Sequence, residues 1–435
     1  MEPILIGIFS GILLGILLLL GVPVAFSLGI SGIISIFMLR GWEPLVFLLA
    51  TFPFSTTAVF TYVVLPLFVL MGHLALASGI AEKAYYVSHK VLSGIPGGQA
   101  MASVFGCAAF AAVSGTSVGT AAAMGKIAIP EMRRYGYSPS FAAGCLASAG
   151  TLGILIPPSG MMVLYSIITE VHLGPLLIAG FLPGFLTAGI YSIGIYLMVK
   201  YKPSLFGGKV STYFPWKERL ISLKDGWGII VLFLIVIGGI YSGIFTATEA
   251  SAFGCFAALL ILLITKGNRK KAIIEGLREA SDTTAMVFII ILCAGFFSLA
   301  LAQSRIPSEV ANYVIKLELP TWAMTFILLI PYLILGCLID GVSMLLLVTP
   351  IVFPIVKALN MDPIWFGILV IKTIEIGCIT PPVGLNVFVI SGLCPDIPME
   401  AIFKGCIPFL IMEIIVMILL IAFPSIALFL PSQMQ

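Results

Sequence analysis

The sequence predicts an all-α integral membrane protein, and its composition is the first reason. Of the 435 residues, 60% are hydrophobic and only 9% are charged, whereas an ordinary soluble domain has about 25% charged residues. So few charges could not cover a soluble protein of this length, and lipid must be the solvent for most of the surface. Long apolar stretches are the second reason, because a membrane span needs roughly 20 apolar residues. Examples are residues 3–20, 173–199 and 405–430.

The net charge, the cysteines and the N-terminal segment further limit the class of protein that this sequence can encode. The net charge of +3 does not suggest a nucleic-acid partner. The cysteines lie almost entirely in apolar segments without metal-ligand spacing, which favours a role as small buried residues. The first apolar stretch follows no basic region and no small-residue cleavage site, so we expect a permanent span there.

Basic loops predict how the chain crosses the membrane, because Lys and Arg in short loops mark the cytoplasmic side. Residues 200–225 and 266–279 form two such loops, and the apolar stretch 228–265 between them must cross out and back. The first loop holds Lys200, Lys202, Lys209, Lys217, Arg219 and Lys224, and the second holds Lys266, Arg269, Lys270, Lys271 and Arg278. We also expect the smaller basic loops with Lys83 and Lys90, and with Arg133 and Arg134, to be cytoplasmic.

A re-entrant hairpin is predicted at about residues 92–130. The apolar pieces 97–113 and 118–130 are short for spans, and a polar SGTS sequence at 114–117 separates them. Because both ends lie near loops predicted to be cytoplasmic, the two pieces enter and leave on one side. The irregular backbone at their tip is tolerated at membrane depth only when protein buries it or a wet cavity adjoins it.

The second half of the chain repeats these features about 224 residues later. Pro157 and Pro158 correspond to Pro381 and Pro382, and Gly153 corresponds to Gly377. We predict a first repeat at 1–200, a linker at 201–226 and a second repeat at 227–435. The second repeat then has a re-entrant hairpin at about 322–357, and broken helices lie at about 138–170 and 363–395.

The two repeats are predicted to have opposite topology. The loops around the second hairpin are nearly balanced in charge, so this hairpin enters from outside and both chain ends fall outside. Inverted-topology repeats with two re-entrant hairpins and two broken helices are typical of secondary transporters.

Polar breaks in the apolar segments are the candidate ion sites. Consecutive prolines remove backbone donors and leave carbonyls free, and sodium accepts carbonyl and hydroxyl oxygens as ligands. The first predicted site consists of Ser114, Gly115, Thr116, Ser117, Thr151 and Gly153; the second consists of Asp340, Gly341, Ser343, Thr373, Gly377 and Thr380. In the alternative interpretation, the prolines only kink packed helices and the hydroxyls cap them.

Ionisable residues in apolar runs are further candidates. Lys372 and Glu375 are three residues apart, which allows an ion pair on one helix face or a role in substrate binding or coupling. Glu249 follows Thr246 as in a capping box. The three histidines do not cluster, and no GxxxxGK[ST] loop is present. We therefore expect an ion gradient, rather than ATP, to supply the energy.

Several motifs together resemble one known family, the large membrane subunit of tripartite ATP-independent periplasmic (TRAP) transporters. They are PLFVLMG at 66–72, SGTSVGTAAAMGKIAIPEM at 114–132, GYSPSFAAG at 136–144, GTLGILIPPS at 150–159, AGFLPG at 179–184, TATEA at 246–250 and EIGCITPPVGLNVFV at 375–389. The resemblance covers nearly the whole chain. Ala247 departs from an expected proline, and Thr116 is a mild departure from a serine.

The resemblance implies an elevator-type carrier that imports a small organic acid, such as a C4-dicarboxylate or a sialic acid, together with Na⁺ across the bacterial inner membrane. It implies two partners, a periplasmic substrate-binding protein and a small four-helix membrane subunit. We expect the latter to be a separate chain, because the repeat begins almost at Met1. It also places the substrate between the hairpin tips, near Ser159, Pro157, Pro158, Pro381, Pro382 and Asn386.

Three alternatives remain open from the residues. A self-sufficient sodium–anion symporter would transport without a binding protein. A channel would not saturate or require a sodium gradient. An intramembrane enzyme would need a nucleophile and a base at membrane depth, and no serine has an evident histidine partner in the sequence.

Overall fold

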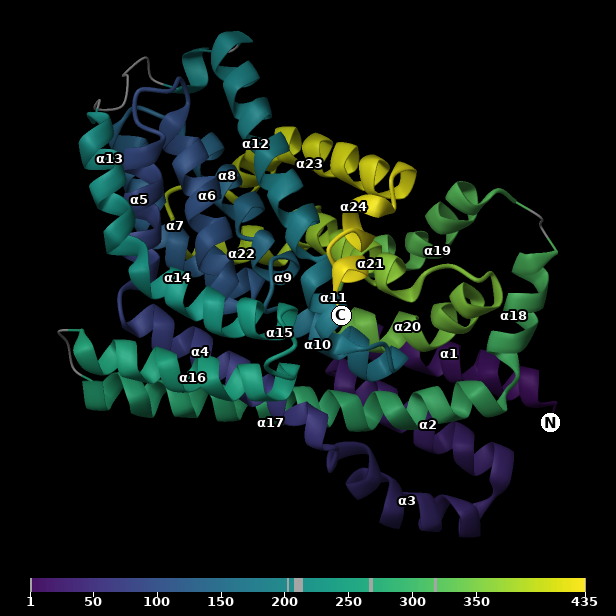
Figure 1. The fold of residues 1–435 in the computed structure, drawn as a ribbon. Coiled ribbons are helices and arrows are strands. Elements are labelled where there is room, and N and C mark those ends of the chain that lie inside the picture. The colour runs from purple at the N-terminus through teal and green to yellow at the C-terminus, as the bar shows by residue number, and fades with distance from the viewer. Residues whose placement is uncertain (1, 202, 207–213, 266–268, 317–318, 435) are drawn as a thin grey trace.

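The structure is a computed structural model that describes residues 2–201, 203–206, 214–265, 269–316 and 319–434. All regular structure in these ranges is helical (Figure 1). The predicted all-α class is therefore confirmed. The basic residues Lys202, Lys209 and Lys266 lie outside the described residues.

The first repeat predicted from the sequence begins with helices that precede the first polar tip. These are α1 (Pro3–Leu19), α2 (Val24–Arg40), α3 (Trp42–Thr57), the 3₁₀ turn η1 (Phe60–Val63), α4 (Val64–Ala77) and α5 (Ile80–Val91). The tip and the first break follow in α6 (Gly98–Ser114), α7 (Ser117–Arg134), α8 (Pro139–Ala149), α9 (Leu152–Leu155), α10 (Gly160–Thr169), α11 (Leu173–Ala179) and α12 (Phe181–Tyr201).

The second half begins after the predicted linker. Its first elements are η2 (Pro203–Phe206), α13 (Trp216–Ser222), η3 (Leu223–Gly226), α14 (Trp227–Phe233), the π-helical turn η4 (Leu234–Gly238), α15 (Gly239–Tyr241), α16 (Ala247–Ile264), α17 (Arg269–Gln303) and α18 (Ile306–Ile315). The second tip and break lie in α19 (Thr321–Gly336), α20 (Gly341–Ala358), α21 (Pro363–Cys378), α22 (Leu385–Leu393), α23 (Met399–Ala422), α24 (Ser425–Leu428) and η5 (Pro431–Gln433).

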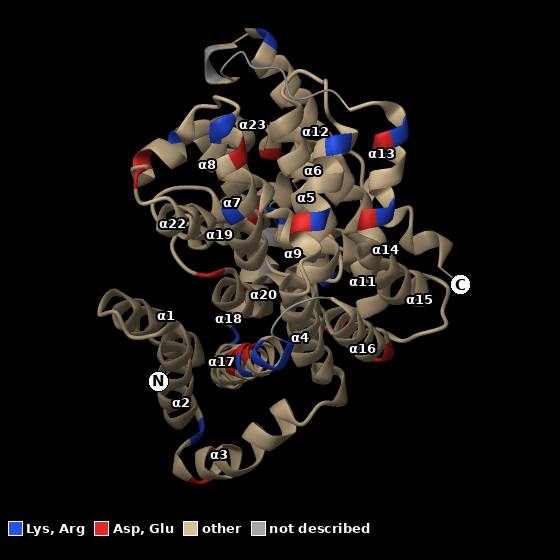
Figure 2. Cartoon of the chain, turned by 90° about the vertical axis from the view of Figure 1, so that its left-hand side faces the viewer, with Lys and Arg blue, Asp and Glu red and all other residues tan. Residues whose placement is uncertain are grey.

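The helices have the length and composition of a multi-pass membrane protein. Among the described residues, seven helical segments are long and apolar enough to cross a membrane, or up to eight if the bent pair Pro139–Leu155 and Gly160–Thr169 forms one span. That pair bends by 43° in the segment predicted to be a broken helix. Charged residues gather on a few segments, such as α5 and α13, and most of the helix surface carries none (Figure 2).

Several predicted boundaries are wrong. The second limb of the first hairpin does not end at Pro130, because α7 continues to Arg134. Arg133 and Arg134 lie in its last turn, where positive charge stabilises the C-terminal end of a helix. Most of the predicted loop 266–279 is helical, because α17 begins at Arg269. A Lys271–Glu275 pair with a 3.7 Å separation lies on this first part of α17. The apolar stretch 405–430 is divided, because α23 ends at Ala422, shortly before Pro424.

Two groups of helix contacts describe the packing. In one group, α17 packs along α2 and α4, and α16 packs along α4, at the lower side of Figure 1. In the other group, the first and second halves of the chain cross. Helix α22 contacts α7 and α8, while α10 contacts α20, and α9 contacts α21. Each broken helix therefore packs against the tip-forming helices of the opposite half as well as its own.

Candidate ion and substrate site

Hydroxyl oxygens gather at the first tip, between α6 and α7. Thr116 caps α7, because its Oγ1 accepts from the Gly119 N–H at 3.2 Å. Ser114 Oγ lies 2.6 Å from Thr120 Oγ1, and the Thr120 hydroxyl donates to the Thr116 carbonyl at 2.8 Å. Thr120 is not among the site residues predicted from the sequence. Its position four residues after Thr116, one turn along the same helix face, is a signal that could have identified it.

The first broken helix touches this tip at Gly153. A Cβ atom at Gly153 would lie against the Thr116 carbonyl oxygen and 2.5 Å from Thr120 Oγ1, so only glycine fits. After the break, the Gly160 N–H donates to the Gly115 carbonyl at 3.2 Å. Thr151, between α8 and α9, is placed differently, because its hydroxyl donates to the carbonyl of Ser148 in α8 at 2.7 Å. The structure thus brings Ser114, Gly115, Thr116 and Gly153 together.

The second tip, between α19 and α20, carries a carboxylate. Asp340 caps α20, because its Oδ2 accepts from the Ser343 N–H at 3.0 Å. A Cβ atom at Gly377 would lie 2.7 Å from the carbonyl oxygen of Gly336, so α21 touches the end of α19 there. The hydroxyls of Thr373 and Thr380 donate to carbonyls one turn earlier in the chain, at 2.9 Å and 2.6 Å.

A cavity of about 50 Å³ adjoins each tip, which is more than the roughly 15 Å³ that one water molecule needs and is enough for an ion. The first cavity is lined by Ser114, Thr116 and Gly119, together with Gly72 and His73 of α4. The second is lined by residues of the tip and of α21, including Asp340, Gly341, Ile374 and Cys378. Hydroxyl, carbonyl and carboxylate oxygens are ligands that hard cations prefer, so the residues at both tips fit a sodium ion.

The two halves meet near the tips. Ser117 of the first tip lies near the Cys378 thiol at the end of α21. In the other direction, a Cβ atom at Gly341 of the second tip would lie 3.2 Å from Cε of Met161 in α10. Each tip therefore faces the broken helix of the opposite half.

The predicted substrate residues differ in accessibility. Pro157 and Pro158 are buried, whereas Pro381 and Pro382 are exposed, and both Pro–Pro bonds are cis. Ser159 is buried and caps α10; its hydroxyl donates to the Ile154 carbonyl. Asn386 is also buried, and its Nδ2 donates to the Ala147 carbonyl at 3.0 Å. In this conformation only the second break presents its prolines at the surface.

Two predicted interactions of charged residues are confirmed. Thr246 and Glu249 form a reciprocal capping box at the start of α16. Lys372 Nζ lies 2.6 Å from Glu375 Oε2, as the spacing suggested. Glu413 of α23 also pairs with Lys372, although it is not among the residues predicted from the sequence. Its place as a carboxylate within an apolar run was the available signal.

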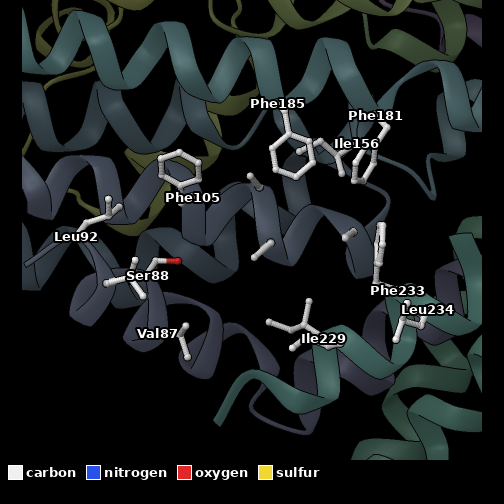
Figure 3. A pocket seen from close by; sticks show the side chains of 15 residues that line it. Val87, Ser88, Leu92, Phe105, Ile156, Phe181, Phe185, Ile229, Phe233 and Leu234 are labelled. Atoms are coloured by element: carbon white, nitrogen blue, oxygen red, sulfur yellow. The ribbon is translucent and has the colours of Figure 1, made fainter. Parts of the chain in front are cut away.

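One apolar cavity of the structure is separate from the tips. It measures about 480 Å³ and lies between α5, α6, α12 and α14. Figure 3 shows its lining of aromatic and aliphatic side chains, with Ser88 as the one hydroxyl. A carboxylate buried there would have almost no hydrogen-bond donors, so this cavity does not fit an organic acid.

Comparison with known proteins identifies the family. A family model described as the DctM component of the tripartite ATP-independent periplasmic transporter matches residues 11–426. The C4-dicarboxylate TRAP transporter large permease protein DctM of Pseudomonas aeruginosa is 38% identical over 408 residues, which cover 93% of this chain and 94% of that protein. The chain is a multi-pass membrane protein of the transporter-permease class. It belongs to the DctM component family of tripartite ATP-independent periplasmic transporters.

Other relatives differ in the solute that they are named for. The sialic acid TRAP transporter large permease protein SiaM of Vibrio cholerae is 30% identical over 86% of both chains. The isethionate TRAP transporter permease protein DctMQ of Oleidesulfovibrio alaskensis is 30% identical, and the match covers 98% of this chain but 66% of that longer protein. The YdaH transporter of Alcanivorax borkumensis has the same fold, with a TM-score of 0.61 at 13% identity over 88% of this chain and 89% of that one.

Proposed function

We propose that this chain is the large membrane subunit of a sodium-coupled transporter that imports a small organic acid. One observation carries the proposal: each of the two tips has oxygen ligands and a cavity large enough for an ion, and a glycine of a broken helix touches each tip. Sodium ions bound at the tips would hold Gly115 and Asp340 in place on either side of the substrate. Sodium binding and substrate binding would then support each other.

The helix directions at the tips favour an anionic substrate. Helices α7, α10 and α20 all begin at a tip or a break, and their N-terminal N–H groups carry partial positive charge. Discontinuous helices of secondary transporters direct such N-termini at substrate carboxylates. The relatives named for C4-dicarboxylates, sialic acid and isethionate also handle acids, which supports the same class of substrate here.

The assembly and the mechanism belong to the same proposal. We infer that a periplasmic binding protein delivers the acid and that a small membrane subunit accompanies this chain in the inner membrane. The longer relative named DctMQ supports the second partner. The crossed contacts of α10 with α20 and of α22 with α7 support two inverted repeats that move together as the mobile part of an elevator.

Reconstitution into lipid vesicles tests this function. The chain, the small subunit and the binding protein loaded with a C4-dicarboxylate or a sialic acid are combined, and uptake is measured under an inward sodium gradient. We expect saturable uptake that falls to background when potassium replaces sodium. Equal uptake in both salts would contradict sodium coupling. Full uptake without the binding protein would instead favour a self-sufficient symporter.

A further inference from the structure

The apolar cavity between α5, α6, α12 and α14 takes no part in the proposed ion and substrate sites. It measures about 480 Å³, and the aromatic rings of Phe105, Phe185 and Phe233 form part of its wall (Figure 3). Ser88 alone brings a hydroxyl to the described residues that line it. Water and polar solutes would find almost no hydrogen-bond partners there, so the cavity suits an apolar occupant.

The cavity opens toward lipid between α12 and α14. Ile230 and Leu234 of α14 line it with exposed fractions of 51% and 59%, and Phe185 of α12 is 46% exposed. The two helices meet at one end of the cavity, where the ring centroids of Phe181 and Phe233 are 5.4 Å apart. Both helices belong to segments long and apolar enough to cross a membrane. The opening is therefore continuous with the lipid-facing surface.

Tryptophan and lysine side chains indicate the level of this opening in the membrane. Trp216 and Trp227 are exposed, and the exposed side chains of Lys217 and Lys224 lie close to them in the sequence. Tryptophan rings and long lysine side chains gather at the membrane–water interface. Ile229 of the cavity follows Trp227 by two residues, about 3 Å along a helix axis. The cavity thus begins just inside the hydrocarbon region.

The size of the cavity selects among apolar occupants. A helix with its side chains is about 10–12 Å across, so two turns of helix need roughly 850 Å³ or more. The cavity has about 480 Å³, which is too small for a helix of a partner subunit. An unbranched acyl chain is much narrower than a helix and bends to follow an irregular apolar wall. Membrane phospholipids supply such chains directly at the opening.

The inner wall of the cavity belongs to the first hairpin and the first break. Helix α6 contributes Ala108, Ala109 and Ala112, whose small side chains on one face leave the space open. Ile156, which directly precedes Pro157, also lines the cavity. A Cβ atom at Gly184 of α12 would lie against Ile156, so this side chain is held between α12 and the cavity. An occupant would therefore contact the first broken helix.

We propose that this cavity binds one acyl chain of a membrane phospholipid, whose headgroup stays at the level of Trp227. The chain enters between α12 and α14 and extends along the alanine face of α6 to Ile156. This binding site goes beyond the proposed function, because it requires neither sodium nor an organic acid. It adds a lipid contact beside the first broken helix.

A phosphatidylethanolamine with a photoreactive diazirine near the end of one acyl chain tests the site. The full chain is placed in phosphatidylethanolamine–phosphatidylglycerol vesicles that contain this probe, alone and together with the small membrane subunit. After irradiation, labelled residues are mapped by mass spectrometry. We expect label on Ile156, which is 2% exposed and faces the cavity, as well as on Ile411 of α23, which is 56% exposed and reports bulk lipid.

Filling the cavity should remove the inner label. Ala109→Phe places a ring where the chain would lie, and each methylene group that the ring displaces is worth about fourfold in affinity. We expect the ratio of Ile156 label to Ile411 label to fall by at least about tenfold, since several methylene groups are displaced. Ala252→Phe is the matched control, because it adds the same ring at an exposed position of α16 outside the cavity. It should keep the wild-type ratio.

A smaller substitution and a second measurement keep the test decisive. If Ala109→Phe does not fold, Ala109→Leu should still lower the ratio by at least about threefold. In detergent, added phosphatidylethanolamine should raise the thermal unfolding midpoint of the wild type more than that of the filled variant, because only the wild type retains the site.

Three results would overturn the lipid site. The first is label on Ile411 without label on Ile156 in the wild type, because the chain would then stay outside. The second is an unchanged ratio in folded Ala109→Phe or, where only the smaller variant folds, in Ala109→Leu. The third is loss of the Ile156 label when the small subunit is present, because a partner would then close the cavity. None of these results depends on sodium-coupled uptake, so a failure of the proposed function is separate.

Discussion

At Gly153 the absence of a side chain lets the first broken helix touch the first tip. The Thr116 carbonyl and the Thr120 hydroxyl occupy the space that a Cβ atom would need. Gly377 has the same relation to Gly336 at the second tip. Spacing along the sequence pairs these two glycines, and their close contacts give the physical reason for that pairing.

Gly153→Ala should disturb the first ion site directly. The added methyl group pushes the break away from Thr116 and Thr120, so we expect sodium-stimulated uptake to fall by at least about tenfold, as when packing is forced in a filled interior. Gly189→Ala is the control, because nothing lies within 4 Å of its added methyl group. Vesicle uptake at equal protein levels measures both. Native uptake by Gly153→Ala would mean that the break and the tip need not touch.

Among the elements, α16 shows a boundary that local sequence fixes completely. The Thr246 hydroxyl accepts from the Glu249 N–H at 3.3 Å, and Glu249 Oε2 accepts from the Thr246 N–H at 2.9 Å. Both partners lie within four consecutive residues, so no distant part of the chain is needed. By contrast, α17 begins inside a predicted loop, because helix formation there also draws on packing against α2 and α4.

Loss of this capping box should cost stability and little else. Thr246→Ala removes the acceptor for the Glu249 N–H, and such caps contribute about 1 kcal/mol. We expect a lower thermal unfolding midpoint in detergent and unchanged sodium dependence of uptake. Thr248→Ala, two residues further on, is the matched control because its side chain caps nothing in the described structure. Equal midpoints for the two variants would argue against a contribution from the cap.

At the scale of the whole molecule, the crossing of the two halves defines the candidate site. Helix α10 packs on α20, and α22 packs on α7, so residues more than 170 positions apart in the chain come together. The exposure of Pro381 and Pro382, with Pro157 and Pro158 buried, makes the two halves unequal in this conformation. An elevator with inverted repeats would exchange these accessibilities between its two end states.

The predicted topology is testable with introduced cysteines. Lys217 in α13 and Lys357 at the end of α20 are both exposed, and they are expected on opposite sides of the membrane. In intact cells, a membrane-impermeant thiol reagent should label Lys357→Cys but label Lys217→Cys only after permeabilisation. The parent protein measures the background from its native cysteines. Labelling of Lys217→Cys in intact cells would reverse the proposed orientation.

The sequence by itself determined the membrane class, the two polar tips, the paired prolines and the Lys372–Glu375 pair. These features follow from composition, from spacing along one helix, or from a repeat that keeps its spacing. Only the tertiary structure decided that Thr120 joins the first tip, that Glu413 and Tyr191 extend the Lys372–Glu375 pair, and that Ser159 and Asn386 bond to the backbone. Contacts between distant helices depend on how their faces pack, and chain spacing does not encode that packing.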